Sequence, residues 1–436
     1  MAEASAVAFG RYLRALRERR RLSLHRVCQL TGDLLDKGAL SRLERGQQVP
    51  SIFKLGPLSR VYEVSPEALI ERMELDREVE RLGRPSTEGK TYEELHRFGG
   101  AALVRDNRKW EAYAYFRDAL PLAGEDKRIP AWCNLVTAIR SLGKNALALH
   151  ELSELQASGE LAPAQRALVH ERMSNCHRCL GDMRRAEECA ESAAAQAIAL
   201  GDSRTLAFAY TARANAALDQ ERWEAAYEDL RRALVAYRES AQQECMLAPN
   251  PAFEAQVLLM LAESSIHLGN LARARRLALA AKRMSQEHGL PLGLAYSELH
   301  LGRIDEREGA RGRARERFRR AAALAERTRN HRLLFSVELE LLRQAHRAGD
   351  SARARASRRR LERLAPSVPR HIPAMREFKE GFGQDRPRPA RAVEGGTHEV
   401  VSKASAARAR VGARHVAGDP RRAGSGLRGV TDSRYL

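Results

Sequence analysis

A seven-residue segment near the N-terminus carries side chains that are suited to reading DNA. It runs Leu40-Ser41-Arg42-Leu43-Glu44-Arg45-Gly46. In a helix, Leu40 and Leu43 share the inner face, whereas hydroxyl and guanidinium groups point outward and the glycine ends the helix. A guanidinium such as that of Arg42 can pair with guanine O6 and N7 in the major groove, which is worth roughly 1–3 kcal/mol of discrimination. The segment therefore predicts a DNA-recognition helix.

Four further short helices are expected around this segment. Phe9, Leu13 and Leu16 recur at helical spacing in the first of them, and Leu55 and Leu58 lie in the one that follows the motif. Serine or aspartate side chains commonly accept the free amides at the start of a helix. Candidate N-caps of this kind precede the second to fifth helices: Ser23, Asp36, Ser51 and Ser65.

Basic residues are concentrated at the two ends of the chain. The formal net charge is +19, and residues 1–60 hold twelve Lys or Arg against five acids. Residues 365–436 hold fourteen against seven. This distribution favours a polyanionic partner, with nucleic acid as the commonest one. An arginine-rich and alanine-rich genome is the alternative source of the bulk charge, and the basic end of the chain is either a phosphate-attracting segment or a solvated one.

Short turns recur about every 40 residues through the middle of the chain, between amphipathic helical segments. The repeat predicts stacked helical hairpins. The turns are centred on Asp106, Gly143, Gly181, Gln220, Gly269, Glu308 and Gly349. Small residues follow them, where a second helix must approach the first: Ala112, Ala146, Ala186, Ala225, Ala274, Ala314 and Ala354.

Several function classes find no support in the sequence. Phosphate-cradling glycine loops, His-Glu-x-x-His pairs and nucleophile elbows are absent, so we expect no enzyme and no cofactor. Cys176-His177-Arg178-Cys179 lacks a second cysteine pair at ligand spacing, and we interpret it as helix packing rather than a metal site. Without an apolar span or a signal core, and with six cysteines in a long chain, a cytoplasmic protein is expected.

The N-terminal pattern resembles the lambda-repressor-like, Cro-type (XRE) helix-turn-helix family over about 65 residues. The match is carried by the Leu40–Gly46 motif with Pro50-Ser51, and by Leu22-Ser23-Leu24 and Thr31-Gly32. The resemblance implies that Lys37, Gly38 and Arg42 read base edges, that Arg45 and Lys54 hold phosphates, and that Arg17 and Glu44 form an internal ion pair. Ser41 faces outward on the same helix and completes the expected DNA-binding set. Two departures are a turn at Gly32–Asp36 that is longer by about two residues, and a glycine at position 38.

The repeats resemble tetratricopeptide repeats (TPR), and the combination is similar to the quorum-sensing regulators of Gram-positive bacteria. That resemblance implies a homodimer in which a peptide or protein ligand in the concave groove alters DNA binding. Polar residues of the first helices are candidate groove positions, with ordinary inter-helix hydrogen bonding as the equal alternative: Asn134, Asn175, Arg213, Asn215 and Glu263.

Together these patterns predict an all-α chain: a five-helix DNA-binding domain followed by an α-solenoid of about seven TPR-like hairpins. We expect the domain at residues 1–80, a linker at 81–91, the array at 92–365 and a disordered basic tail at 366–436. The predicted function is a sequence-specific transcriptional regulator that binds double-stranded DNA. The alternative is a TPR interaction scaffold whose helix-turn-helix module has become a docking surface.

Overall fold

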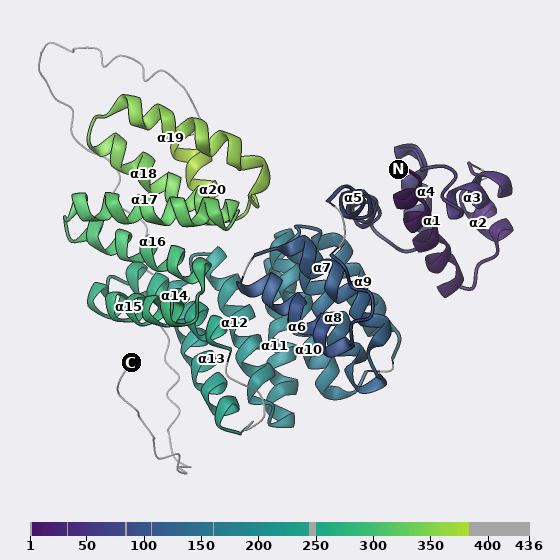
Figure 1. The fold of residues 1–436 in the computed structure, drawn as a ribbon, viewed down its shortest axis with the longest axis horizontal. Helices are drawn as coiled ribbons and strands as arrows, with labels where there is room; N and C mark the ends of the chain where they lie inside the picture. Colours follow the sequence, from purple (N-terminus) through teal and green to yellow (C-terminus); the bar gives the residue numbers. More distant parts are fainter. Residues whose placement is uncertain are drawn as a thin grey trace, which may run out of the picture.

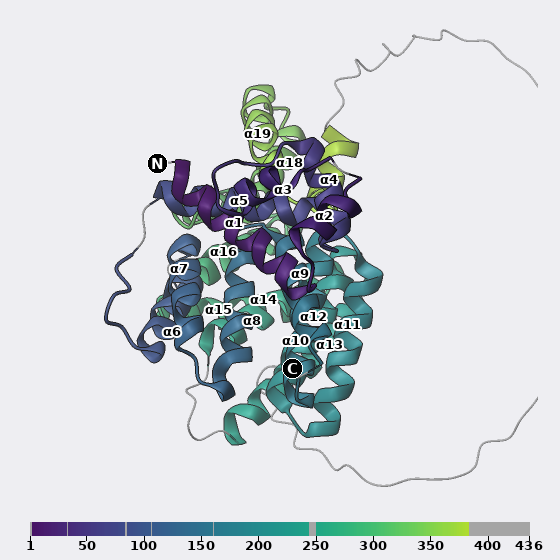
Figure 2. The same cartoon turned by 90° about the vertical axis from the view of Figure 1, so that its right-hand side faces the viewer.

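The chain is helical in every regular element that the structure describes, which confirms the all-α prediction (Figure 1). The computed structural model describes residues 2–32, 34–82, 85–105, 107–159, 161–243 and 250–382. A five-helix domain lies at one end of an array of helical hairpins. Figure 2, viewed from the end that carries this domain, shows α1 to α5 in front of the array.

The N-terminal domain consists of α1 (Ala2–Arg19), α2 (Leu24–Leu30), α3 (Lys37–Glu44), α4 (Ile52–Val61) and α5 (Pro66–Leu82). Three predicted caps accept a backbone amide: Ser23 from Arg26, Asp36 from Ala39 and Ser65 from Ala68. Ser51 stands at the N-cap position of α4, but its side chain makes no capping hydrogen bond. Helix α5 extends two residues into the predicted linker, and residues 85–91 have no regular secondary structure.

Two glycines allow α1 to lie directly against the end of α3. A Cβ atom on Gly10 would stand 2.5 Å from the carbonyl oxygen of Leu43, and one on Gly46 would stand 2.4 Å from the Cα atom of Val7. Both distances are far below van der Waals contact, so neither position accepts a side chain without moving backbone. Gly46 also has a φ of +71°, which favours glycine.

Seven helical hairpins follow in the described part of the chain. Helix α6 (Tyr92–Gly100) continues as a π-helical turn, Ala101–Arg105. The hairpins are α6 with α7 (Lys109–Ala119), α8 (Glu125–Ser141) with α9 (Asn145–Ala157), α10 (Pro163–Leu180) with α11 (Met183–Leu200), α12 (Ser203–Asp219) with α13 (Trp223–Gln243), α14 (Pro251–His267) with α15 (Leu271–Glu287), α16 (Pro291–Arg307) with α17 (Arg311–Arg327), and α18 (His331–Arg347) with α19 (Ser351–Leu364).

The turns inside the hairpins share one backbone geometry. Each contains one residue with a positive φ, and the residue five positions later is a buried alanine where the second helix crosses the first. Glycine is the usual turn residue because it adopts this φ without strain, yet Asn107 and Glu221 adopt it as well. The buried alanines are Ala112, Ala148, Ala186, Ala226, Ala274, Ala314 and Ala354.

This register corrects two of the alanines that the sequence suggested. Ala225 is exposed and Ala146 is only half-buried, whereas Ala226 and Ala148 occupy the packing position. In the fourth hairpin the turn was centred on Gln220, whereas Glu221 has the positive φ. In the second hairpin the turn centre Gly143 was correct, but the sequence offers both Ala146 and Ala148, and only Ala148 lies five residues after it.

The five-helix domain and the first hairpins share one apolar core. Leu13, Leu69 and Leu75 of the domain belong to the same buried cluster as Leu147 and Leu152 of α9. Polar contacts line the same junction. The Glu71 carboxylate accepts from the amide of Leu147 at 2.8 Å, Lys144 pairs with Glu74, and Arg20 donates to Glu154 at 3.0 Å. The domain is therefore anchored to the array through α1, α5 and α9.

The structure also corrects the start of the predicted disordered tail. Residues 366–382 are packed: a 3-10 turn (Ala365–Ser367) leads to α20 (Pro373–Glu377) and a π-helical turn (Phe378–Phe382). Val368, Ile372, Met375 and Phe378 are buried against α18 and α19. Their spacing of three or four residues is a helical pattern that the neighbouring prolines obscured. The rest of the predicted tail, 383–436, lies outside the described residues.

Candidate functional site

Helix α3 presents its polar residues on the surface and its apolar residues to the core. Leu40 and Leu43 are buried in the domain, whereas Lys37, Gly38, Arg42 and Arg45 are exposed and Ser41 is half-buried. Figure 1 shows α2 and α3 at the outer end of the molecule, on the side away from the hairpins. Residues predicted to read bases thus share one accessible helix face.

Gly38 leaves space for the Arg42 side chain over the first turn of α3. A Cβ atom on Gly38 would stand 3.2 Å from Nη1 of Arg42 and 3.1 Å from Oδ1 of Asp36. Any side chain at position 38 would therefore crowd the guanidinium. Glycine at position 38 departs from the family pattern, and it leaves room for the Arg42 side chain.

An ion pair between Arg17 of α1 and the buried Glu44 of α3 holds the two helices together. Arg17 Nε donates to Glu44 Oε1 at 2.6 Å, and Nη2 donates to Oε2 at 2.9 Å. Arg17 Nη1 also donates to the carbonyl of Leu22 at 2.9 Å. The hydrogen bonds that Arg17 donates to Glu44 raise the pKa of Arg17. Because Glu44 is buried, this two-pronged pair holds the recognition helix at a defined angle.

An exposed apolar group lies next to this face and was not anticipated from the sequence. Ile52 and Phe53 begin α4 with 70% and 86% of their surface exposed, and Lys54 follows them, half-buried. The loop residue Val49 is also exposed. The signal in the sequence was the run Ile52-Phe53 directly after a cap, where a polar first turn is usual.

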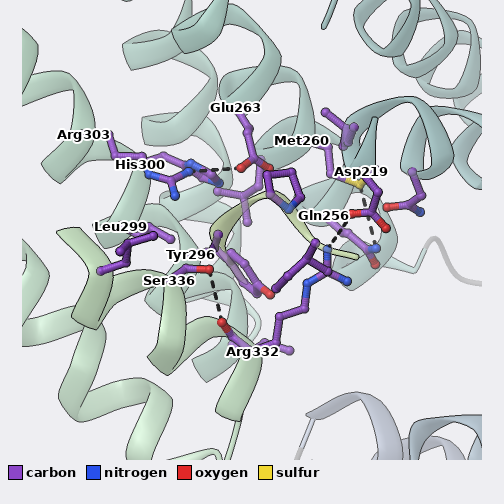
Figure 3. A pocket seen from close by; sticks show the side chains of 18 of the residues that line it. Asp219, Gln256, Met260, Glu263, Tyr296, Leu299, His300, Arg303, Arg332 and Ser336 are labelled. Carbon is purple, nitrogen blue, oxygen red and sulfur yellow. Dashed lines mark hydrogen bonds and ion pairs between the residues drawn. The ribbon is translucent and has the colours of Figure 1, made fainter. Parts of the chain in front are cut away.

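A cavity of about 1280 Å³ lies on the concave side of the array. Its walls come chiefly from the first helix of the hairpins, from α8 through α18, and residues 372–381 close one side. In Figure 3, side chains from α12, α14, α16 and α18 surround the space. No residue of α9, α11, α15, α17 or α19 lines it, so these second helices form the outer surface.

Three of the five predicted groove residues line this cavity: Asn175, Asn215 and Glu263. The other two do not, because each is engaged with a neighbouring helix. Asn134 lies 2.9 Å from His96, and Arg213 forms a two-pronged ion pair with Asp229 at 2.6 and 2.7 Å. The alternative of ordinary inter-helix bonding thus describes Asn134 and Arg213.

Alternating charges form a ladder across one wall of the cavity. Arg303 of α16 contacts Glu263 of α14 at 3.0 Å and Glu340 of α18 at 2.7 Å. Arg343 also pairs with Glu340 at 2.8 Å. Burial opposes the charged forms, but these arginines hold the pKa of Glu340 below its usual range. The ladder connects three successive hairpins through paired charges.

Two neutral imidazoles and a tyrosine add aromatic surface to the same wall. Burial lowers the pKa of both His267 and His300 to about 4, so both are uncharged at neutral pH. His267 stacks on Trp223 with ring centres 3.7 Å apart, and Tyr296 stacks near His300 (Figure 3). The Nδ1 atom of His300 is buried without a hydrogen-bond partner. The wall therefore combines flat apolar surfaces with a free polar atom.

Asp219 closes the ring of hairpins around the cavity. Its carboxylate contacts Arg178 of α10 at 2.6 Å and Arg332 of α18 at 2.9 Å, and His371 lies 3.7 Å away. Arg376 of α20 donates to the carbonyl of Asp219 at 3.1 Å. Burial alone would raise the pKa of Asp219, but His371, Arg332 and Arg178 hold it well below its usual range. Elements more than a hundred residues apart meet at this side chain.

The cysteine cluster shows packing contacts in the described structure. Cys176 is buried and burial raises its pKa to about 12, whereas Cys179 lies 3.9 Å from Nη1 of Arg140. In the residues that the structure describes, no three His, Cys, Asp or Glu side chains gather as metal ligands would. None of the described helices is both long enough and apolar enough to cross a membrane.

Comparison with known proteins identifies the N-terminal domain. Residues 8–73 match the family model described as a helix-turn-helix domain. No curated protein matches the chain. Solved structures that resemble it at low identity include Bacillus thuringiensis PlcR in complex with the peptide PapR7 and DNA. That structure has 16% identity and a TM-score of 0.40, and the match covers 68% of this chain and 99% of that one.

Two further solved structures also resemble the chain at low identity. The apo form of RapI has 11% identity and a TM-score of 0.47, with 63% of this chain and 97% of that chain covered. Aspartyl phosphate phosphatase F from Bacillus subtilis has 15% identity and a TM-score of 0.49, with 83% and 93% covered. Residues 8–73 are therefore a helix-turn-helix domain, and a solenoid of TPR-like hairpins follows it in the chain.

Proposed function

We propose that this protein is a sequence-specific transcription regulator that binds DNA through α3 and senses a peptide or protein ligand in the concave cavity. The observation that carries the proposal is the exposed face of α3, with Lys37 and Arg42 at the outer end of a helix-turn-helix domain. A helix of this kind enters the major groove with its N-terminal residues against the base edges.

The side chains of the domain divide into three roles in this proposal. Lys37, Ser41 and Arg42 read base edges, and Gly38 provides the space that Arg42 needs. Arg45 and Lys54 hold phosphates, which position the protein without reading sequence. Arg17 and Glu44 keep α3 at the angle that the groove requires. Two copies of the chain bind half-sites about one helical turn of DNA, roughly 34 Å, apart.

The cavity supports a ligand larger than a metabolite. Its volume of about 1280 Å³ exceeds the roughly 300–1,000 Å³ of ordinary small-molecule sites. Apolar side chains such as Met260 and Leu299 line the wall together with paired charges, and Asn215 offers an amide group, whereas the amide nitrogen of Asn175 donates to Glu171. Amides of this type pair well with the backbone of an extended peptide. The proposed ligand is therefore a peptide segment, free or part of a protein.

The DNA-binding half of the proposal is tested by selecting duplexes from a random library with the full-length protein. The selected operator is then titrated with a Lys37→Ala/Arg42→Ala variant and with a matched Arg166→Ala/Arg184→Ala control, whose exposed arginines lie on the array. We expect at least a tenfold loss of operator affinity for the first variant and none for the control. Equal affinities of both variants for the operator contradict the proposal.

The competing function is an interaction scaffold in which the helix-turn-helix domain serves as a docking surface. The scaffold function predicts that the selection enriches no DNA sequence. It also predicts that the full-length protein captures a protein partner from cells. The same two variants separate the functions. Loss of operator binding by the Lys37→Ala/Arg42→Ala variant with partner capture intact supports the regulator, whereas no change in DNA binding supports the scaffold.

A further inference from the structure

The outer surface of the last three hairpins is strongly and selectively basic. Helix α17 carries seven arginines against two glutamates, and α19 carries six against one. Helix α15 carries four arginines and one lysine against one glutamate. We call the exposed surface of α15, α17 and α19 the basic face. Figure 1 shows these helices at the opposite end of the molecule from α3.

The positive charge lies on particular helices. A uniformly arginine-rich composition would not produce this uneven distribution. The second helices of the four preceding hairpins, α7, α9, α11 and α13, together carry seven basic and eleven acidic residues. The first helices paired with the basic ones, α14, α16 and α18, carry five basic and seven acidic residues. Among the second helices of the hairpins, arginine is therefore enriched in those of the last three hairpins.

Many of these arginines have no acidic partner among the described residues. Exposed side chains that form none of the described ion pairs include Arg276, Arg313, Arg319, Arg355 and Arg359. An unneutralised cluster of like charges destabilises a fold through its own repulsion. Adjacent helices of the face are nevertheless tied together, because Arg360 of α19 bonds Glu326 of α17 at 2.8 Å. Helices α17 and α19 are thus joined by an ion pair, while many of the arginines around it carry unpaired charge.

The chemistry of the face fits phosphate groups better than a protein surface. Leu279 is the only large apolar residue of α15, α17 and α19 that is exposed, whereas protein interfaces depend on buried aromatic or aliphatic anchors. Guanidinium groups bind phosphate oxygens in pairs and in fixed geometry. Helices α15 and α17 have 17 residues each and α19 has 14, so they are about 21–25 Å long, which is comparable to the width of a DNA duplex.

We propose that the basic face is a second DNA-binding surface, which contacts the phosphate backbone of a duplex without reading its sequence. The surface is distinct from α3 and lies at the other end of the solenoid. One protein molecule therefore holds two DNA segments: an operator at the helix-turn-helix domain and a second duplex segment at the basic face.

The test compares three full-length proteins on a random-sequence duplex of about 40 base pairs, over a range of salt concentrations. The first is the natural chain. The second replaces Arg276, Arg313, Arg319, Arg355 and Arg359 with glutamine. The third replaces Arg166, Arg184, Arg185, Arg231 and Arg232, which are exposed on α10, α11 and α13, with glutamine. Both variants lose five positive charges. Three of the control arginines, Arg184, Arg185 and Arg231, pair with acids, so the comparison tests unpaired charge on the basic face against largely paired charge elsewhere on the array.

We expect the basic-face variant to lose at least tenfold in affinity at moderate salt. Its log–log salt slope becomes shallower by about 3 to 5, since each phosphate contact contributes about 0.9. The control variant keeps the natural slope. Equal losses in both variants show a bulk charge effect and overturn the proposal, as does an unchanged slope in the basic-face variant. Selective loss of binding to phosphatidylserine vesicles, with DNA binding unchanged, assigns the face to a lipid surface instead.

Discussion

The pairing of a glycine with an arginine four residues later is the distinctive feature of the recognition helix. Glycine is a poor helix former, so position 38 lowers the stability of α3. The empty space beside its Cα atom is where the Arg42 guanidinium lies, 3.2 Å from the missing Cβ. The glycine thus lowers helix stability and leaves room for Arg42, the side chain proposed to read a base.

Replacing Gly38 with alanine is expected to raise stability and lower operator affinity at once. Alanine favours the helix by about 0.5–1 kcal/mol, and its methyl group requires the guanidinium of Arg42 to shift from its position over the first turn. We expect the unfolding midpoint in urea to rise and operator affinity to fall about tenfold. Glycine-to-alanine at the exposed Gly312 of α17, where a Cβ meets no neighbour, is the matched control for helix propensity. Unchanged operator affinity would show that the space beside residue 38 has no function.

At the scale of the element, the hairpins follow one geometric rule. The residue five positions after the positive-φ turn residue is the point where the two helices touch, and it is alanine in all seven described hairpins. A methyl group is the largest side chain that fits where two helix backbones lie this close.

Adjacent alanines in α13 provide a direct test of this rule. Ala226 is buried at the crossing point, and Ala225 is exposed one residue before it. Ala226→Leu is expected to lower the free energy of unfolding by about 2 kcal/mol through overpacking. Ala225→Leu should change it by less than about 0.5 kcal/mol. Denaturant unfolding of both variants measures the difference, and a larger effect at Ala225 would reject the register.

The sequence predicted the elements because their signals are local. The turn glycines, the caps Ser23 and Asp36, and the spacing of Leu40 and Leu43 all act within a few residues. The cavity wall was only partly predicted, since it depends on the path of the superhelix. Nothing near Asp219 indicates that Arg332 and Arg376 will meet it. The basic face was hidden for the same reason, because charge summed along the chain averages over the inward and outward helices.

At the scale of the whole molecule, Asp219 joins the middle of the array to its end. The carboxylate is buried and its pKa is depressed, so it stabilises the closed ring in its charged form. A group with a depressed pKa contributes fully above the ordinary aspartate value of about 4 and loses the contribution as the pH falls through the folded-state pKa. Closure of the ring is therefore stable at neutral pH and weakens only in strong acid.

Asp219→Asn is expected to destabilise the protein in a pH-dependent way. Removing one member of a buried ion-pair cluster costs roughly 3–5 kcal/mol at pH 7. The difference from the natural chain should shrink as the pH falls below about 4. Denaturant unfolding at pH 7 and pH 3 measures both values, with Asp126→Asn at an exposed site of α8 as control. A difference that stays constant with pH would show that the charge of Asp219 is not what closes the ring.

The apolar core that runs without a break from α1 and α5 into α9 has a mechanical consequence. Because the five-helix domain shares this core with the second hairpin, a movement of that hairpin also moves the domain and its helix α3. A change in the superhelical pitch of the array therefore changes the position of α3. In the proposed dimer, the distance between the two α3 helices then depends on the superhelical pitch of the arrays, and the preferred operator spacing reports that pitch.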